Sequence, residues 1–120
     1  MTTYVLLSDI HGNYPALNAV VESEGLDANY IVLGDLMGLL ARPAAVIDLL
    51  EEIQPQILLA GNHDRAIFEF GEGHVNSAEL SSFERDHTLN TLSDESIDFM
   101  RSVPFMDVLQ DGGNRIAAAH

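Results

Sequence analysis

The chain of 120 residues contains no cysteine and no lysine, and its only permanently positive side chains are five arginines. The absence of cysteine excludes disulfide bonds and thiolate metal ligands. A metal site in this chain must therefore use histidine, carboxylates, amides or backbone oxygens. Because the arginines are scattered, no basic patch is available for a phosphate backbone, and we expect no nucleic-acid binding by charge.

Long apolar segments are absent as well. The first residues, MTTYVLLSDIHG, lack the basic region and the long apolar core of a signal peptide, and no segment is long enough to span a membrane. We therefore expect no membrane partner and a cytoplasmic location.

Acidic residues dominate the charge. Nineteen Asp and Glu against five Arg give a net charge of −14. Such a surplus keeps a protein soluble, but the charges repel one another in the folded state, and concentrated salt would screen that repulsion. Two interpretations remain open, a salt-loving host and an ordinary acidic cytosolic protein.

The length predicts a single domain, and the first half of the chain predicts an α/β fold. Apolar runs at residues 3–9, 29–35 and 55–62 read as strands. The segments between them have helical periodicity, with Asn13 as a helix cap and Pro43 in a first turn. Strands that are apolar throughout and alternate with helices indicate a parallel sheet covered on both faces.

The second half predicts helices followed by a hairpin. Residues 74–92 favour a helix without a strong apolar stripe. Ser93 is placed to cap a second helix over residues 94–102, which Pro104 would stop. Residues 105–120 then read as strand, tight turn and strand.

Polar side chains follow each predicted strand of the first half. The carboxyl ends of parallel strands form the ligand crevice of an α/β sheet, so these side chains should converge. They are Asp9 and His11 after the first strand, Asp35 after the second, and Asn62, His63 and Asp64 after the third.

This donor set favours divalent metal chemistry. Carboxylate, imidazole and amide ligands without thiolates suit Mn, Fe, Zn or Ni. One carboxylate can bridge two such ions, and the ions lower the pKa of a shared water so that hydroxide forms near neutral pH. No nucleophilic side chain is then needed, in keeping with the absence of cysteine and of a serine nucleophile motif.

The motifs DIHGN at residues 9–13, GD at 34–35 and GNHD at 61–64 resemble, in this order, those of the calcineurin-like metallophosphoesterases. The segments SDIHGNYPAL, GNHDRA and LSDESIDFMRSVP resemble the small bacterial and archaeal phosphodiesterase branch. This resemblance implies an α/β sandwich of two β-sheets flanked by helices, over one domain of residues 1–120. It also implies hydrolysis of a phosphomono- or phosphodiester, in a small molecule or a phosphoprotein, by a hydroxide that bridges two metals.

The resemblance assigns roles to individual residues, with Mn as the first expectation for the two divalent ions and Fe, Zn or Ni as alternatives. His63 would contact the phosphate and stabilise the leaving oxygen, and Asp64 would orient His63. The metal ligands would be Asp9 and His11 for the first ion, Asp35 bridging both ions, and Asn62 and His120 for the second.

One family motif is absent. The family has a later Gly-His-x-His motif that supplies a further ligand to each metal, and the sequence ends at His120 without it; GHVN at residues 73–76 has half of the pattern. The resemblance therefore predicts a domain that is incomplete at its C-terminus, without the last part of the second sheet. A non-catalytic metal-binding or scaffold protein of the same fold remains an alternative, and a flavodoxin-like binding domain is a third.

Simpler interpretations exist for single residues. Asp64 could be a plain helix N-cap and His120 a frayed terminus. Arg65 suits a phosphate, but we favour a surface role for it. His74 and His87 read as solvated side chains.

Overall fold

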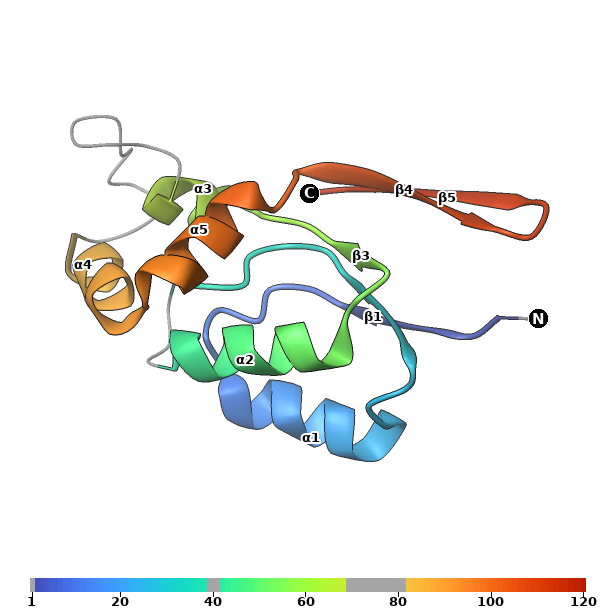
Figure 1. Ribbon diagram of the computed structural model, residues 1–120, viewed down its shortest axis with the longest axis horizontal. Helices are drawn as coiled ribbons and strands as arrows, with labels where there is room; N and C mark the ends of the chain where they lie inside the picture. Colours follow the sequence, from blue (N-terminus) through green and yellow to red (C-terminus); the bar gives the residue numbers. More distant parts are fainter. Residues whose placement is uncertain (1, 39–41, 69–81) are drawn as a thin grey trace.

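The computed structural model describes residues 2–38, 42–68 and 82–120 (Figure 1). Its first half contains a three-stranded parallel sheet with the order β1 (Tyr4–Leu7), β2 (Asn29–Val32) and β3 (Ile57–Leu58). In the register, Leu7 lies beside Val32 and Val32 beside Leu58. All three strands therefore end at the same edge, as the sequence predicted, and the loops that follow them start side by side.

Strand β3 is shorter than the apolar run that predicted it. Regular pairing covers two residues, although the Leu59 amide still donates to the Val32 carbonyl at 2.9 Å. The Ala60 amide then donates to the Pro104 carbonyl at 2.8 Å, so the chain leaves the parallel ladder for the segment before β4. Buried Leu59 and Ala60 thus serve packing rather than regular strand pairing.

Helices α1 (Tyr14–Glu24) and α2 (Pro43–Ile53) cover one face of this sheet (Figure 1). The Asn13 side chain accepts a hydrogen bond from the Ala16 amide at 3.2 Å, which is the predicted N-cap. The apolar stripes of the two helices enter the main core, through Leu17, Val21, Val46, Ile47, Leu50 and Ile53.

Three more helices follow, α3 (Asn62–Phe68), α4 (Ser82–Thr91) and α5 (Asp94–Ser102). The Ser93 side chain accepts from the Ser96 amide at 3.1 Å and caps α5 as predicted. Helix α4 confirms the expected helix for residues 82–91, whereas residues 74–81, with His74 and most of GHVN, lie outside the described part of the chain. None of the helices in the described ranges is long and apolar enough to cross a membrane.

The chain ends in an antiparallel hairpin of β4 (Met106–Asp111) and β5 (Asn114–Ala119), which lies on the other face of the parallel sheet (Figure 1). Partly buried Leu109, Ile116 and Ala118 pack with Ile31, Ile57 and Leu59 of that sheet. The result is the predicted α/β arrangement of two sheets with helices. Because the hairpin packs on the parallel sheet, the C-terminal end of β5 lies near the ends of β1, β2 and β3.

Candidate metal centre

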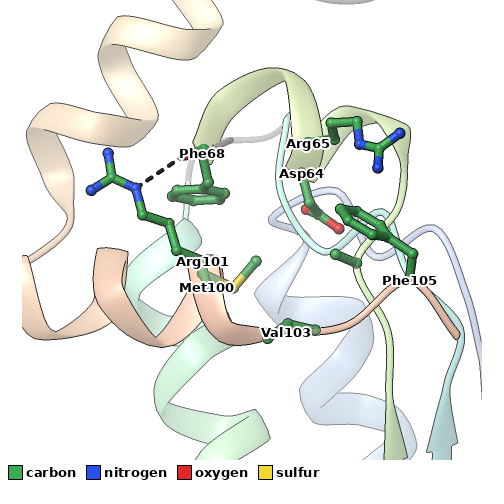
Figure 2. A pocket seen from close by; sticks show the side chains of 8 residues that line it. Asp64, Arg65, Phe68, Met100, Arg101, Val103 and Phe105 are labelled. Carbon is green, nitrogen blue, oxygen red and sulfur yellow. Dashed lines mark hydrogen bonds between the residues drawn. The ribbon is translucent and has the colours of Figure 1, made fainter. Parts of the chain in front are cut away.

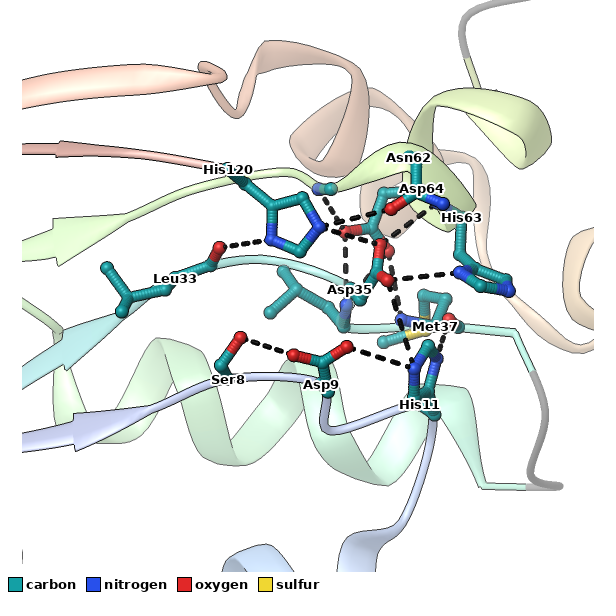
Figure 3. Close-up of polar contacts among 12 residues, drawn as sticks. Ser8, Asp9, His11, Leu33, Asp35, Met37, Asn62, His63, Asp64 and His120 are labelled. Carbon is teal, nitrogen blue, oxygen red and sulfur yellow. Dashed lines mark hydrogen bonds and ion pairs between the residues drawn. The ribbon is translucent and has the colours of Figure 1, made fainter. Parts of the chain in front are cut away.

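The loops after β1 and β2 run side by side beyond the sheet and bring Asp9 and His11 next to Asp35 (Figure 3). The Asp9 amide donates to the Gly34 carbonyl at 3.0 Å, and the His11 amide donates to the Asp35 carbonyl at 2.9 Å. Asp9, His11 and Asp35 have positive φ angles of 56°, 50° and 53°. Such angles are uncommon outside glycine, and the paired loop backbones hold these residues in them.

Asp35 lies at the centre of the polar cluster and is 3% exposed. Its carboxylate accepts from the His63 backbone amide at 3.0 Å and lies 3.0 Å from Nδ1 of the same residue. It also lies 3.8 Å from Nε2 of His11 and 3.6 Å from Nε2 of His120. One buried carboxylate therefore faces imidazoles from the ends of β1, β3 and β5.

Backbone carbonyls orient two of these imidazoles. Nδ1 of His11 lies 3.2 Å from the Met37 carbonyl, and Nδ1 of His120 lies 2.7 Å from the Leu33 carbonyl. A carbonyl can only accept, so each Nδ1 carries the proton and the lone pair of the neutral ring is on Nε2. In both residues, Nε2 is the atom that faces Asp35, as for a metal-ligating histidine fixed by a second hydrogen bond.

Asp9 closes the cluster on the β1 side. The Ser8 hydroxyl donates to its Oδ2 at 2.5 Å, and its Oδ1 lies 3.5 Å from Nε2 of His11. The hydrogen bond from Ser8, helped by the nearby His11, lowers the pKa of Asp9. The carboxylate is therefore ionised at neutral pH, although its side chain is 58% exposed.

Asp64 has a different environment from the one expected for it. Its carboxylate accepts from the backbone amides of Leu36, Met37 and Gly61 at 2.8–3.0 Å, and among the described residues it makes no hydrogen bond to the His63 ring. Burial raises the pKa of Asp64 against the effect of these amides. In this structure Asp35 is the carboxylate that pairs with the His63 imidazole, and the orienting role expected for Asp64 stays a prediction.

Two glycines allow the loops to approach so closely. A Cβ atom on Gly61 would fall on the Asp35 carboxylate, and one on Gly34 would lie 2.7 Å from Nδ1 of His120. Gly34 also has a φ of +109°, which side-chain-bearing residues rarely adopt. The GD and GN pairs of the sequence thus provide the space for Asp35 and His120.

Comparison with known proteins identifies the chain. The sequence pattern of the calcineurin-like phosphoesterases matches residues 2–120. The chain belongs to this family. None of the curated proteins compared with the chain matches it.

Solved structures show the same fold. A metallophosphoesterase from Sphaerobacter thermophilus superposes with a TM-score of 0.70 at 28% identity, over 93% of the present chain and 44% of its own. A hypothetical protein, PH1004, from Pyrococcus horikoshii OT3 superposes with a TM-score of 0.76 at 24% identity, over 98% of the present chain and 54% of its own. The present chain thus spans about half the length of these structures.

The family implies divalent metal ions, and the residues present fit them. His11, Asp35 and His63 offer ligand atoms that all lie within 4.8 Å of one another. With the Asn62 amide oxygen turned toward the cluster, that oxygen lies 3.1 Å from Nε2 of His120 and 3.2 Å from the Asp35 carboxylate. Lone pairs that face one another in this way are stabilised by a cation; without one, the amide turns and donates to the same atoms.

The structure brings together six of the seven sequence-predicted site residues: Asp9, His11, Asp35, Asn62, His63 and His120 (Figure 3). Their assignment as ligands or catalytic groups stays a prediction. The seventh residue, Asp64, lies beneath this cluster, and its carboxylate accepts hydrogen bonds from backbone amides. It is the third residue of α3 and caps the Gly61 amide from there, so it is not the plain N-cap considered as an alternative.

Sequence reasoning missed the groups that orient the cluster. Ser8 stands directly before Asp9, and a hydroxyl beside a predicted ligand was a usable signal. The carbonyls of Leu33 and Met37 left no signal, because every residue has one and only the fold selects which faces an imidazole.

Proposed function

We propose that this chain carries the metal centre of a phosphoesterase that hydrolyses a phosphomono- or phosphodiester. The observation that supports the proposal is the convergence of two imidazole Nε2 atoms, the Asn62 amide and the Asp9 carboxylate around buried Asp35. Asp9, His11, Asp35, Asn62 and His120 would hold two divalent ions, with manganese as the first candidate.

Bound ions would supply a water of lowered pKa and would withdraw charge from the phosphate oxygens. The protein's own residues provide the positioning. Asp35 fixes His63 through both its backbone amide and its Nδ1, which leaves Nε2 of His63 as the atom that can face a substrate. We assign to His63 the contact with the phosphate and the stabilisation of the leaving oxygen.

Asp64 has a positioning role in this proposal. By accepting from the amides of Leu36, Met37 and Gly61, it joins the loop after β2 to the start of α3. Asp35 comes from the first of these segments and His63 from the second. The spacing between the central carboxylate and the imidazole therefore depends on Asp64.

Metal binding and hydrolysis test the proposal together. Metal-free protein is titrated with Mn²⁺ by calorimetry, and the loaded protein is assayed with bis-p-nitrophenyl phosphate and p-nitrophenyl phosphate. We expect Asp35→Asn to weaken Mn²⁺ binding at least tenfold and to abolish turnover. His63→Ala should retain the metal and lose at least a hundredfold in kcat, in the range of a lost acid–base group.

Asp48→Asn is the matched control, since it makes the same chemical change on the exposed side of α2. It should bind and turn over as the wild type does. Wild-type protein that binds no Mn²⁺, or that hydrolyses both esters as fast as Asp35→Asn does, would exclude the proposed function. Metal binding without turnover would favour the non-catalytic alternative.

A further inference from the structure

A hollow of about 290 Å³ lies beside the proposed metal centre, against the side chains of Asn62 and His120. Gly61, just before α3, and Arg65, within α3, also line it, and Phe105 lines it from the segment before β4. Asn62 and His120 are the two residues expected to hold the second ion. A phosphate bound at that ion would therefore have this hollow at its side.

Arg65 reaches the hollow because of its position on α3. It follows Asn62 by three positions, so the two side chains lie on the same face of the helix. The guanidinium carbon of Arg65 lies 4.1 Å from the centre of the Phe105 ring (Figure 2). A cation is attracted to the face of such a ring, so Phe105 holds the positive charge of Arg65 at the wall of the hollow.

The charge of the hollow differs from that of the whole chain. The chain has nineteen acidic residues and five arginines, yet the described residues that line the hollow include one arginine and no carboxylate. Asp64, next to Arg65 in the sequence, lines a separate cavity of about 300 Å³ between α3 and α5 (Figure 2). The hollow therefore favours an anion, and a guanidinium binds phosphates and carboxylates through paired hydrogen bonds.

Arg65 and His63 lie on different sides of the centre. Residues two positions apart on a helix are separated by about 200° around its axis. Nδ1 of His63 lies 3.0 Å from the Asp35 carboxylate, and its ring contacts the His11 ring, whereas Arg65 lies at Phe105. In the proposed function the leaving oxygen faces His63. A group at Arg65 would then belong to a substituent that stays on the phosphorus.

We infer that Arg65 is a specificity residue, which binds a second anionic group of the substrate on the substituent that stays on the phosphorus. This inference rests on the proposed function, since the metal centre sets the position of the phosphate. It narrows the substrate class to phosphodiesters whose retained substituent carries a further negative charge.

Two phosphonates test the inference by affinity. Mn²⁺-loaded protein, freed of excess metal, is titrated by calorimetry with 3-phosphonopropionate and with propylphosphonate, which has a methyl group in place of the carboxylate. We expect 3-phosphonopropionate to bind at least about threefold more tightly, as for one partly exposed ion pair. Without a cation to receive it, an added carboxylate should weaken binding to a chain of net charge −14.

Variants test the residue. Arg65→Gln should abolish the preference for 3-phosphonopropionate and leave the affinity for propylphosphonate unchanged. Arg115→Gln makes the same change at an exposed position near the turn of the hairpin and should retain the preference. A preference that persists in Arg65→Gln would place the carboxylate elsewhere, and equal weakening of both phosphonates would place Arg65 on the phosphate itself. Either result overturns the inference.

Hydrolysis of bis-p-nitrophenyl phosphate separates this inference from the proposed function. The ester carries no charge besides that of its phosphate, so Arg65→Gln should retain the kcat and KM of the wild type. Wild-type protein that binds Mn²⁺ and hydrolyses the ester, but binds the two phosphonates equally, overturns the role of Arg65 and leaves the metal centre standing. Wild-type protein that binds no Mn²⁺ overturns the proposed function and this inference with it.

Discussion

Buried polar side chains join the segments that follow the strands of this protein through hydrogen bonds, and Asp64 is an example. Its two carboxylate oxygens accept four backbone hydrogen bonds of 2.8–3.0 Å from Leu36, Met37 and Gly61, at a side chain that is almost fully buried. A carboxylate offers only acceptors, which is what this ring of N–H groups requires. An amide of the same shape cannot satisfy it, because one of its two ends is a donor.

Asp64→Asn should therefore destabilise the fold. The amide nitrogen would face at least one backbone N–H, so we expect a loss of about 1–3 kcal/mol in the free energy of unfolding. Urea denaturation followed by circular dichroism measures it. Asp98→Asn on the exposed side of α5 is the control and should stay within about 0.5 kcal/mol of the wild type. Similar losses in the two variants would contradict this account of Asp64.

A second residue-scale prediction concerns alkaline pH. Burial raises the pKa of Tyr30, whose hydroxyl donates to the Gly25 carbonyl at 2.8 Å. The native phenol then keeps its proton at a pH where the unfolded phenol loses it, so the unfolded state binds fewer protons. Stability should fall as the pH rises above about 10, by at most about 1.4 kcal/mol per pH unit for this group.

Tyr30→Phe should remove this contribution to the slope and cost about 1 kcal/mol at neutral pH through the lost hydrogen bond. Urea titrations between pH 8 and pH 11 would compare it with the wild type. If the variant and the wild type lose stability with pH in parallel, Tyr30 does not carry the effect.

For single residues, the sequence indicated which residue types form the site more reliably than it indicated which groups they contact. The strand-end pattern predicted correctly that Asp9, His11, Asp35 and Asn62 would meet, because parallel strands place their carboxyl ends together. It did not indicate the backbone amides from which Asp64 accepts its hydrogen bonds. A carboxylate next to a histidine in sequence need not face it in space, since adjacent residues at the start of a helix point about 100° apart.

For helices and strands, the predictions that depend on neighbouring residues in the sequence were confirmed. Helices α1 and α5 begin at the predicted caps, and the hairpin turns between Asp111 and Asn114, inside the segment 105–120 that predicted a strand, a tight turn and a strand, since these signals act within a few residues. Strand β3 ended early, because its backbone turns to the Pro104 carbonyl, a partner more than forty positions away. No local pattern encodes such a partner.

The hairpin turn allows an element-scale test. Gly112 has a φ of +60°, and nothing lies within 4 Å of the position of an added Cβ on either turn glycine. Gly112→Ala should therefore cost about 1 kcal/mol through backbone strain alone. Gly113→Ala is the matched control, because its φ is outside the left-handed range, and it should be neutral or slightly stabilising. Equal effects on urea denaturation would show that the turn geometry does not limit stability.

The whole molecule carries a net charge of −14, and acidic side chains such as Glu51 and Glu52 stand exposed and close together on α2. Repulsion among exposed carboxylates extends over about 8 Å at physiological ionic strength and about 3 Å at 1 M salt.

Concentrated salt should for this reason stabilise the fold as a whole. Raising KCl from 0.1 M to 2 M should increase the free energy of unfolding by at least about 1 kcal/mol, which corresponds to a rise of about 4 °C in the melting temperature of a domain of this size. The double variant Glu51→Gln/Glu52→Gln lowers the net charge from −14 to −12 by removing two carboxylates, and its melting temperature should rise less with KCl. Sucrose, which carries no charge, should stabilise both proteins equally. A melting temperature that KCl leaves unchanged would favour an ordinary acidic protein over one adapted to a salt-rich host.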